Sequence, residues 1–193
     1  MKKFLRKLHK FFYNKRISFY KNVLSEIKPA EDALLRCSAL FIGKGKIGFG
    51  KNVTIGYYPS PDFYQGYSHF EARGDHSEIF IDEGTRINNH AVIIANETKI
   101  SIGKNCRIGT NFQCFDSNFH GLTIKDRDNH SAVKNTEVKI GDNVFIGNNV
   151  IFLPGSGAGN GAVIGAGSVV TKFIPENTVA AGNPAKVIKN IEN

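Results

Sequence analysis

The stretch KIGDNVFIGNNVIFLPGSGAGNGAVIGAGSVVTKFIP, residues 139–175, places an apolar residue at every sixth position. These positions are Ile140, Ile146, Phe152, Ala158, Ile164 and Val170, and glycine or asparagine recurs between them. A fixed short period is typical of a solenoid, in which each unit packs only on its neighbours. Six residues make one short strand and a turn, and three such units make one triangular coil. The stretch therefore predicts a parallel β-helix.

The same period continues towards the N-terminus. It recurs at Ile102 and Ile108, at Ile81, Ile87 and Ile93, and less clearly at Phe41, Ile47 and Val53. Between about residues 40 and 180 no helical spacing of apolar residues is present, which excludes an alternating α/β architecture. We expect an all-β domain over residues 29–189, with glycine and asparagine in left-handed conformations at its tight corners.

Residues 116–137, DSNFHGLTIKDRDNHSAVKNTE, interrupt the period and include seven charged side chains. A solenoid accepts an insertion only where the chain leaves a corner. We therefore expect these residues to form a loop extruded from the prism. Polar loops of this kind often carry functional residues.

The formal net charge of +8 is concentrated in residues 1–28, which hold nine Lys or Arg and one acid. The remaining residues are balanced in charge, so the domain offers no net positive field to a nucleic acid. Within this arm Phe4, Leu5, Leu8, Phe11 and Phe12 recur at helical spacing between basic residues, which predicts an amphipathic helix. Its apolar face either lies on an anionic membrane surface or packs on protein, and both interpretations stay open.

The sequence contains no recognisable secretory signal, membrane span or cysteine pairing pattern, and this bears on the location and redox state that we expect. Basic residues interrupt the arm too often for a secretory signal, and no apolar run is long enough to span a bilayer. The three cysteines lack C-x-x-C spacing, which argues against a disulfide framework or a cysteine zinc site. We expect a cytoplasmic protein, peripheral at the cytoplasmic face of the inner membrane if the arm meets lipid.

The hexads and the closing segment GAGSVVTKFIPENTVAAGNPAKVIK, residues 165–189, resemble the left-handed β-helix acyltransferases of the hexapeptide-repeat family. The resemblance covers about residues 71–189 and is closest to the sugar O-acetyltransferases, related to galactoside and maltose acetyltransferases and to polysaccharide-modifying enzymes. It implies a left-handed coil, acetyl-CoA as donor, no required metal, and a homotrimer with active sites between subunits.

The resemblance places the catalytic histidine at His120, within the interruption. A neutral imidazole is a suitable general base for a sugar hydroxyl that attacks a thioester, and such catalysis contributes about 10²–10⁴-fold. The alternative is a solvated loop histidine. Asp116 either orients the imidazole or caps the loop. Asn89 matches a family asparagine that hydrogen-bonds the acceptor, but it is also an ordinary corner residue.

The resemblance also implies a coenzyme A groove between the C-terminal coils of adjacent subunits. The matching residues are Asn148, Ala166, Thr171, Lys172, Lys186 and Lys189. Small residues would admit the pantetheine arm, and the lysines would offer point charges to phosphates. The alternative is that the glycine-rich turns only form corners and the lysines only a solvated face. Residues 184–193 are expected to form a short tail or a helix over the end of the prism.

Two residues depart from the family pattern. Phe145 stands where many relatives have tryptophan, which changes the wall of the expected site. Ala158 replaces an aliphatic core residue, at a cost of about 2 kcal/mol or more unless a neighbour fills the space. The aromatic segment 56–70, GYYPSPDFYQGYSHF, is expected to be either a saccharide platform or a subunit contact.

The leading prediction is an acetyl-CoA-dependent O-acetyltransferase acting on a sugar of a cell-envelope polysaccharide or its precursor. One alternative is N-acetylation of a nucleotide-linked amino sugar, although no βαβ unit bearing a G-x-G-x-x-G motif precedes the repeats. Inactivation of an antibiotic is another. A zinc hydratase of the same fold would need an H-x-x-x-x-H pair, which the sequence lacks. A non-catalytic scaffold is the remaining alternative.

Overall fold

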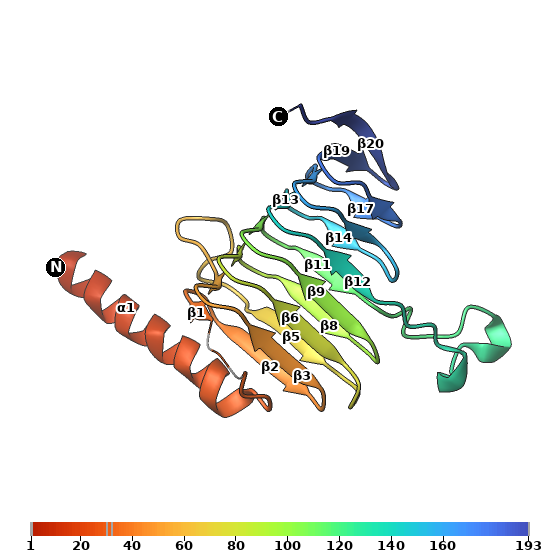
Figure 1. Cartoon of the computed structure of the whole chain (residues 1–193). Coiled ribbons are helices and arrows are strands. Elements are labelled where there is room, and N and C mark those ends of the chain that lie inside the picture. Colours follow the sequence, from red (N-terminus) through yellow and green to blue (C-terminus); the bar gives the residue numbers. More distant parts are fainter. Residues whose placement is uncertain (1, 30, 32, 193) are drawn as a thin grey trace.

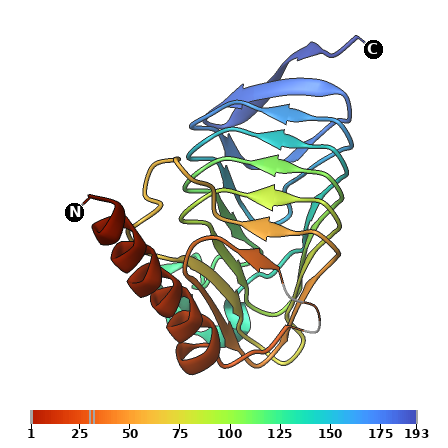
Figure 2. The same ribbon diagram turned by 90° about the vertical axis from the view of Figure 1, so that its left-hand side faces the viewer.

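The chain folds into a left-handed parallel β-helix (Figure 1). The hexads predict the parallel β-helix, and the family resemblance implies its left-handed sense. The computed structural model describes residues 2–29, 31 and 33–192. Three sheets, here named A, B and C, form the sides of a triangular prism. Within each sheet, a strand of one coil is hydrogen-bonded to the equivalent strands of the neighbouring coils. Figure 2 looks onto sheet A.

The strands are short because each must end at a corner of the prism. Sheet A contains β1 (Leu34–Leu35), β4 (Thr54–Ile55), β7 (Arg86–Ile87), β10 (Arg107–Ile108), β13 (Phe145–Ile146), β16 (Val163–Ile164), β19 (Thr178–Gly182) and β20 (Ala185–Asn190). Sheet B contains β2 (Ala39–Gly43), β5 (Ser68–Ala72), β8 (Val92–Ala95), β11 (Gln113–Phe115), β14 (Ile151–Phe152) and β17 (Val169–Val170). Sheet C contains β3 (Lys46–Phe49), β6 (Glu78–Ile81), β9 (Lys99–Ile102), β12 (Val138–Ile140), β15 (Gly157–Ala158) and β18 (Phe173–Ile174).

The periodic apolar residues point into the prism and stack from coil to coil, which confirms the prediction. On sheet A, Ile87, Ile108, Ile146 and Ile164 occupy one register position of successive strands and are at most 4% exposed. Burying a side chain of this size stabilises the fold by about 1.5–3 kcal/mol. The continuous column therefore supplies much of the stability of the prism.

The small residue Ala158 does not leave its layer of the core empty. Its coil also contributes Ile146 and Phe152, and all three side chains are buried. The Phe152 ring packs against the Phe112 ring of the preceding coil, with ring centroids 5.9 Å apart. A large side chain therefore accompanies the small one in the same coil, which is how a core of this density accommodates alanine.

Asparagine forms many of the corners, as the sequence predicts. Asn105, Asn143 and Asn149 have φ angles of 56°, 57° and 58°, in the left-handed region that asparagine tolerates better than most residues. We name a corner by the two sheets it joins: an A–B corner leads from sheet A to sheet B, and a B–C corner from sheet B to sheet C.

Residues 116–137 leave the prism at the B–C corner between β11 and β12 and extend away from it (Figure 1). The loop contains two single-turn 3-10 helices, Ile124–Asp126 and His130–Ala132. Thr123 and Asn129 cap these turns, each accepting a backbone N–H. The loop is thus an ordered excursion from the coil.

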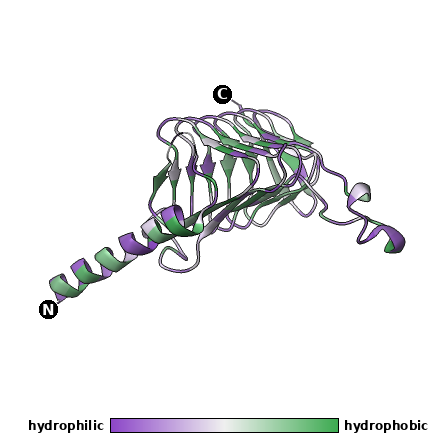
Figure 3. Ribbon diagram, turned by 90° about the horizontal axis from the view of Figure 1, so that it is seen from below, coloured by the Kyte–Doolittle hydropathy of each residue, from purple (hydrophilic) through white to green (hydrophobic). Residues whose placement is uncertain are grey.

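The N-terminal arm is helical, comprising α1 (Lys2–Phe19) and a π-helical turn, Tyr20–Leu24. Figure 3 shows α1 projecting from the base of the prism, with apolar and polar residues on different sides. The Tyr13 hydroxyl donates to Phe63 O, and Arg16 donates to Tyr64 O and Gly66 O at 3.0 and 2.6 Å. The helix is thereby attached to the aromatic segment 56–70. None of the described helices is long and apolar enough to cross a bilayer.

The C-terminal tail is a strand, and the alternative of a helix there is wrong. Gly182, with φ of 105°, begins a reversal, after which β20 returns antiparallel to β19. The last coil would otherwise leave the backbone groups of β19 unpaired at the edge of sheet A. Pairing with β20 satisfies them, which is why the edge favours a strand.

Candidate active site

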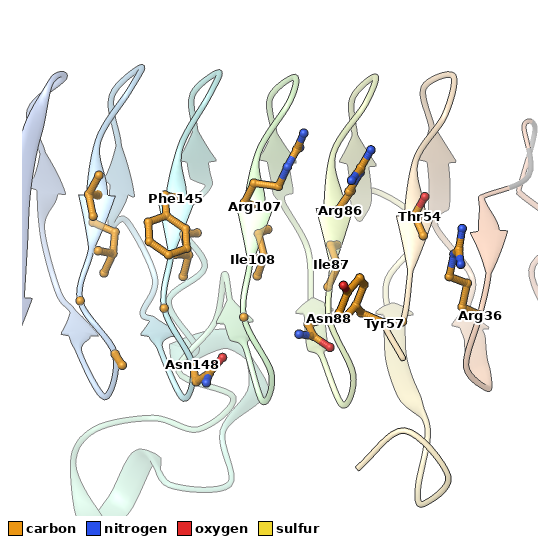
Figure 4. A pocket seen from close by; sticks show the side chains of 18 residues that line it. Arg36, Thr54, Tyr57, Arg86, Ile87, Asn88, Arg107, Ile108, Phe145 and Asn148 are labelled. Carbon is orange, nitrogen blue, oxygen red and sulfur yellow. The ribbon is translucent and has the colours of Figure 1, made fainter. Parts of the chain in front are cut away.

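A groove of about 690 Å³ runs along the outer face of sheet A and onto its A–B corners (Figure 4). We call it the sheet A groove. It crosses successive coils, from Arg36 and Tyr57 near the N-terminal end to Val163 and Ala166 near the C-terminal end. An elongated groove of this size can hold an extended ligand.

The floor of the groove is backbone, because small residues follow the inward-pointing isoleucines. Gly109, Gly147 and Gly165 occupy this position in three successive coils and line the groove. A Cβ added to Gly109 would lie 2.7 Å from Asn148 N, and one added to Gly147 would lie 2.6 Å from Ala166 N. The glycines are therefore required for coil stacking. The same feature leaves backbone accessible to a ligand.

The outward residues of sheet A form one wall of the groove. Arg86, Arg107, Phe145 and Val163 occupy equivalent positions on successive strands. Phe145 is 54% exposed, so it presents an apolar surface between the arginines and the C-terminal coils. The position that departs from the family pattern thus belongs to the groove.

Of the residues matched to a donor site, two lie in the sheet A groove. Asn148 and Ala166 stand at successive A–B corners. The Asn148 side-chain oxygen accepts from Thr110 N at 3.0 Å, which fixes its orientation. The side chain of Ala166 is a single methyl group, so it leaves the groove wide at this corner. These two positions form the end of the groove nearest the C-terminus.

The other four matched residues lie outside the groove. Thr171 and Lys172 are exposed at the B–C corner between β17 and β18. Lys186 and Lys189 are exposed on β20, opposite Ala181 and Val179 of β19. The matched residues therefore fall at both edges of sheet B and at the end of sheet A, and only two of them line the sheet A groove.

His120 is exposed on the extruded loop. Its Nδ1 lies 3.2 Å from Arg127 O. A carbonyl can only accept, so in the neutral imidazole this contact places the proton on Nδ1 and leaves Nε2 with its lone pair. The backbone of the loop thus supplies the tautomer that a general base needs.

The structure does not bring Asp116 to His120. The Asp116 carboxylate is fully buried and accepts from Asn96 N at 2.7 Å and from both Thr98 N and Thr98 Oγ1 at 2.8 Å. It therefore caps the turn of the preceding coil at the base of the loop. Asp116 is the first residue of the insertion and still belongs to the prism, which is why its side chain faces the turn.

Asn89 is also buried, and its side chain is occupied within the chain. Its Oδ1 accepts from Tyr57 N at 3.0 Å, and its Nδ2 donates to Pro61 O at 2.7 Å. These bonds anchor the aromatic segment beside the groove. The adjacent Asn88 lines the groove instead, and its side chain donates to Ser60 Oγ at 2.8 Å.

Sequence reasoning missed Asn88 and the groove residues Arg36, Arg86 and Arg107. The sequence does indicate that Arg86 and Arg107 face outward from the same sheet, because each precedes a periodic isoleucine that points inward. Without knowing which outer face is grooved, that signal does not distinguish them from other surface cations.

The cysteines do not provide a nucleophile. Burial raises the pKa of the Cys37 thiol to about 11, and it raises the pKa of the Cys106 thiol as well. Complete burial, with a contribution from the nearby Asp116 charge, raises the pKa of Cys114 further. A thiol that stays protonated is a poor nucleophile. Among the described residues, no group of three His, Cys, Asp or Glu could hold a metal ion.

Comparison with protein families identifies the repeat. Residues 99–112 and 137–172 match the hexapeptide repeat of succinyl-transferase. The chain is 36% identical over 165 residues to the putative lipopolysaccharide biosynthesis O-acetyl transferase WbbJ of Escherichia coli K12, a match that covers 81% of this chain and 78% of that protein. Some matches are shorter: the chain spans 44% of a curated relative to which it is 50% identical over 94 residues.

Solved structures give the same result. A hexapeptide-repeat acetyltransferase from Vibrio cholerae in complex with acetyl coenzyme A has a TM-score of 0.55 and 30% identity, over 60% of this chain and 61% of that one. A galactoside acetyltransferase in complex with coenzyme A has a TM-score of 0.55 and 37% identity, over 59% of this chain and 56% of that one.

Proposed function

Because the chain belongs to the hexapeptide-repeat acetyltransferase family, we propose that it moves an acetyl group from acetyl-CoA to a hydroxyl of a sugar in a cell-envelope polysaccharide or its precursor. The name of the E. coli relative supports this acceptor class. The complexes of two similar structures with acetyl-CoA or coenzyme A support the donor.

The observation that carries the proposal is the separation of the candidate residues between two corners. Asn148 and Ala166 stand at A–B corners, whereas Lys172 and the loop with His120 stand at B–C corners. Sheet B separates these two edges within one chain. A side-by-side homotrimer would place the B–C edge of one subunit against the sheet A groove of the next, and so assemble one site from two chains.

In the proposed reaction the pantetheine arm lies on the glycine floor of the groove. The sugar hydroxyl attacks the thioester carbonyl while His120 Nε2 accepts the hydroxyl proton. The tetrahedral intermediate then expels the coenzyme A thiolate, to which the imidazolium returns the proton. Arg127 O holds the Nδ1 proton throughout, so the imidazole needs no carboxylate partner to select its tautomer.

The test is the release of coenzyme A from acetyl-CoA with a panel of neutral, acidic and amino sugars. We expect release that depends on a sugar hydroxyl and is accompanied by an O-acetylated product in mass spectra. Acetylation only of the amine of a nucleotide-linked amino sugar would support the N-acetyltransferase alternative. An absence of both release and acetyl-CoA binding would support the scaffold.

We also propose that α1 binds an anionic membrane surface. Three sides of the helix differ: Tyr13 and Arg16 face the aromatic segment, basic residues dominate a second side, and a third is apolar. On the apolar side Phe4, Phe11 and Phe12 are 68%, 54% and 63% exposed. Nine cations and one acid in residues 1–28 match anionic headgroups better than a second copy of the same basic helix.

Vesicle co-sedimentation tests this attachment. The protein should bind vesicles containing phosphatidylglycerol and not pure phosphatidylcholine, and a Phe4→Ser/Phe12→Ser variant should lose binding about tenfold or more. Phe173→Ser is the matched control, because Phe173 is 59% exposed on sheet C. Equal binding by both variants would contradict the proposal. A change of oligomeric state in the Phe4→Ser/Phe12→Ser variant would instead indicate that the apolar side of α1 binds a second copy of the chain.

A further inference from the structure

Three arginines lie along the N-terminal half of the sheet A groove. Arg86 and Arg107 are direct register partners on β7 and β10, and Figure 4 shows both side chains leaning towards the same end of their strands. Arg36 N donates to Ile55 O, which places Arg36 beside Gly56 at the first coil. All three side chains are exposed and line the groove. Strands are about 4.8 Å apart, so the row spans roughly 14 Å.

The positive charge of this row is not neutralised by any residue that the structure describes. Among the residues that the structure describes, no carboxylate lies within ion-pair distance of Arg36, Arg86 or Arg107. The side chains of Arg36 and Arg86 also make no hydrogen bond to described residues. Arg86 and Arg107 lie on adjacent strands, so they repel each other and an anion between them would remove that repulsion.

Arg107 is held in place for such a contact. Its Nη1 donates to Gly84 O at 3.1 Å, Asn105 O at 3.1 Å and Cys106 O at 2.9 Å. These carbonyls hold the guanidinium near the corners that lead from sheet C to sheet A, while its Nη2 and Nε make no bond to a described residue. A planar fork with free donors suits the paired oxygens of a carboxylate or a phosphate.

The row lies at the opposite end of the groove from the candidate donor residues. Asn148 and Ala166 belong to the coils of β13 and β16, whereas the arginines belong to the coils of β1, β7 and β10. Under the proposed function, a donor held by the C-terminal coils leaves this end to the acceptor. Tyr57 and Asn88 line the same end and add an aromatic face and an amide.

We propose that Arg36, Arg86 and Arg107 form a subsite for an anionic group on the acceptor saccharide. The group is either the carboxylate of an acidic sugar or a phosphate that joins the sugar to its carrier, since both present paired anionic oxygens. This inference rests on the proposed function for its acceptor but not for the binding itself. The arginines select which saccharide is acetylated, and His120 performs the chemistry.

Steady-state kinetics with three matched acceptors tests the subsite: a glucuronic acid-containing disaccharide, its glucose counterpart, and glucose 1-phosphate. For Arg86→Gln/Arg107→Gln we expect kcat/KM to fall about 10- to 100-fold with whichever anionic acceptor is used. The neutral disaccharide and the KM for acetyl-CoA should change less than about twofold. The preferred anion identifies the source as carboxylate or phosphate. Lys139→Gln, at an exposed position on sheet C, is the matched control.

Three outcomes would overturn the proposal: equal loss for neutral and anionic acceptors, a raised KM for acetyl-CoA, or dissociation of the oligomer in the double variant. Calorimetric titration with the same saccharides separates this inference from the proposed function. If no sugar is acetylated but anionic saccharides bind to wild type and not to the double variant, the subsite stands and the O-acetyltransferase fails. If anionic and neutral saccharides bind both proteins equally, the subsite fails.

Discussion

The two edges of sheet B are built from the same repeat and have different roles. At the A–B edge every coil from β7 onwards turns tightly, and glycines such as Gly109 and Gly147 bring the backbones of successive coils together. At the B–C edge one coil opens into the loop 116–137, which carries His120 away from the prism. Under the proposed function, the difference shows how a solenoid combines rigidity with chemistry: the tight edge holds the ligand, and the open edge carries the general base.

Removal of the imidazole tests the open edge and should have the largest effect. His120→Ala should lower kcat by about a hundredfold or more, because the variant lacks the proposed general base while the groove is untouched. Acetyl-CoA binding and the melting temperature should stay at the wild-type values. His130→Ala on the same loop is the control. Acceptor-dependent turnover that persists in His120→Ala would show that another group acts as the general base.

A substitution in the tight edge should affect stability and donor binding together. Gly147→Ala places a Cβ 2.6 Å from Ala166 N, so the two coils must separate locally. We expect a loss of about 1–3 kcal/mol in the free energy of unfolding and a raised KM for acetyl-CoA. Denaturant titration and kinetics measure both. If the KM is unchanged, the floor of the groove does not hold the donor.

Asp116 lies where the open edge meets the prism, and its substitution separates capping from catalysis. Asp116→Asn keeps the shape but replaces one acceptor oxygen with an amide donor facing backbone N–H groups. We expect a loss of about 1–3 kcal/mol in stability, with kcat lowered less than tenfold. A loss of kcat as large as that of His120→Ala, with unchanged stability, would show that the carboxylate acts on the imidazole.

The smallest effect is expected at Cys114, a residue of β11 immediately before the loop. Burial and the Asp116 charge raise the pKa of its thiol, so little thiolate forms at pH 8. Iodoacetamide should therefore leave native Cys114 unmodified in mass spectra and leave activity unchanged, while the unfolded chain reacts fully. Rapid alkylation with inactivation would point to an acyl-enzyme on the prism and away from direct transfer.

Much of the fold could be predicted because inward positions obey a period. Each isoleucine of the column must match the one in the next coil, so the constraint is visible in the sequence. The interruption was visible for the same reason, since Asp116 to Glu137 lacks the period. The return strand β20 was not visible, because the need to pair the edge of β19 arises only once the coil has ended.

The candidate site was less predictable because its residues face outward. Asn89 and Asn88 are neighbours of the same type, yet one is buried beneath the aromatic segment and the other lines the groove. Sequence distinguishes neither, since both are compatible with a corner. The arginine row has no period either: its members lie on coils separated by segments of unequal length. The register of sheet A aligns Arg86 with Arg107, whereas Arg36 lies two positions further along its strand, beside Gly56.

Parallel stacking also gives the sheet A groove a constant spacing from one coil to the next. Each coil advances the groove by one strand spacing, about 4.8 Å, whatever residues it carries. Arg107 and Val163 are two strands apart, so roughly 10 Å separates the arginine row from the coil of Ala166. The distance between the two ends of the groove is thus set by the number of coils between them. It can change only by the insertion or deletion of a whole coil, which is three hexads.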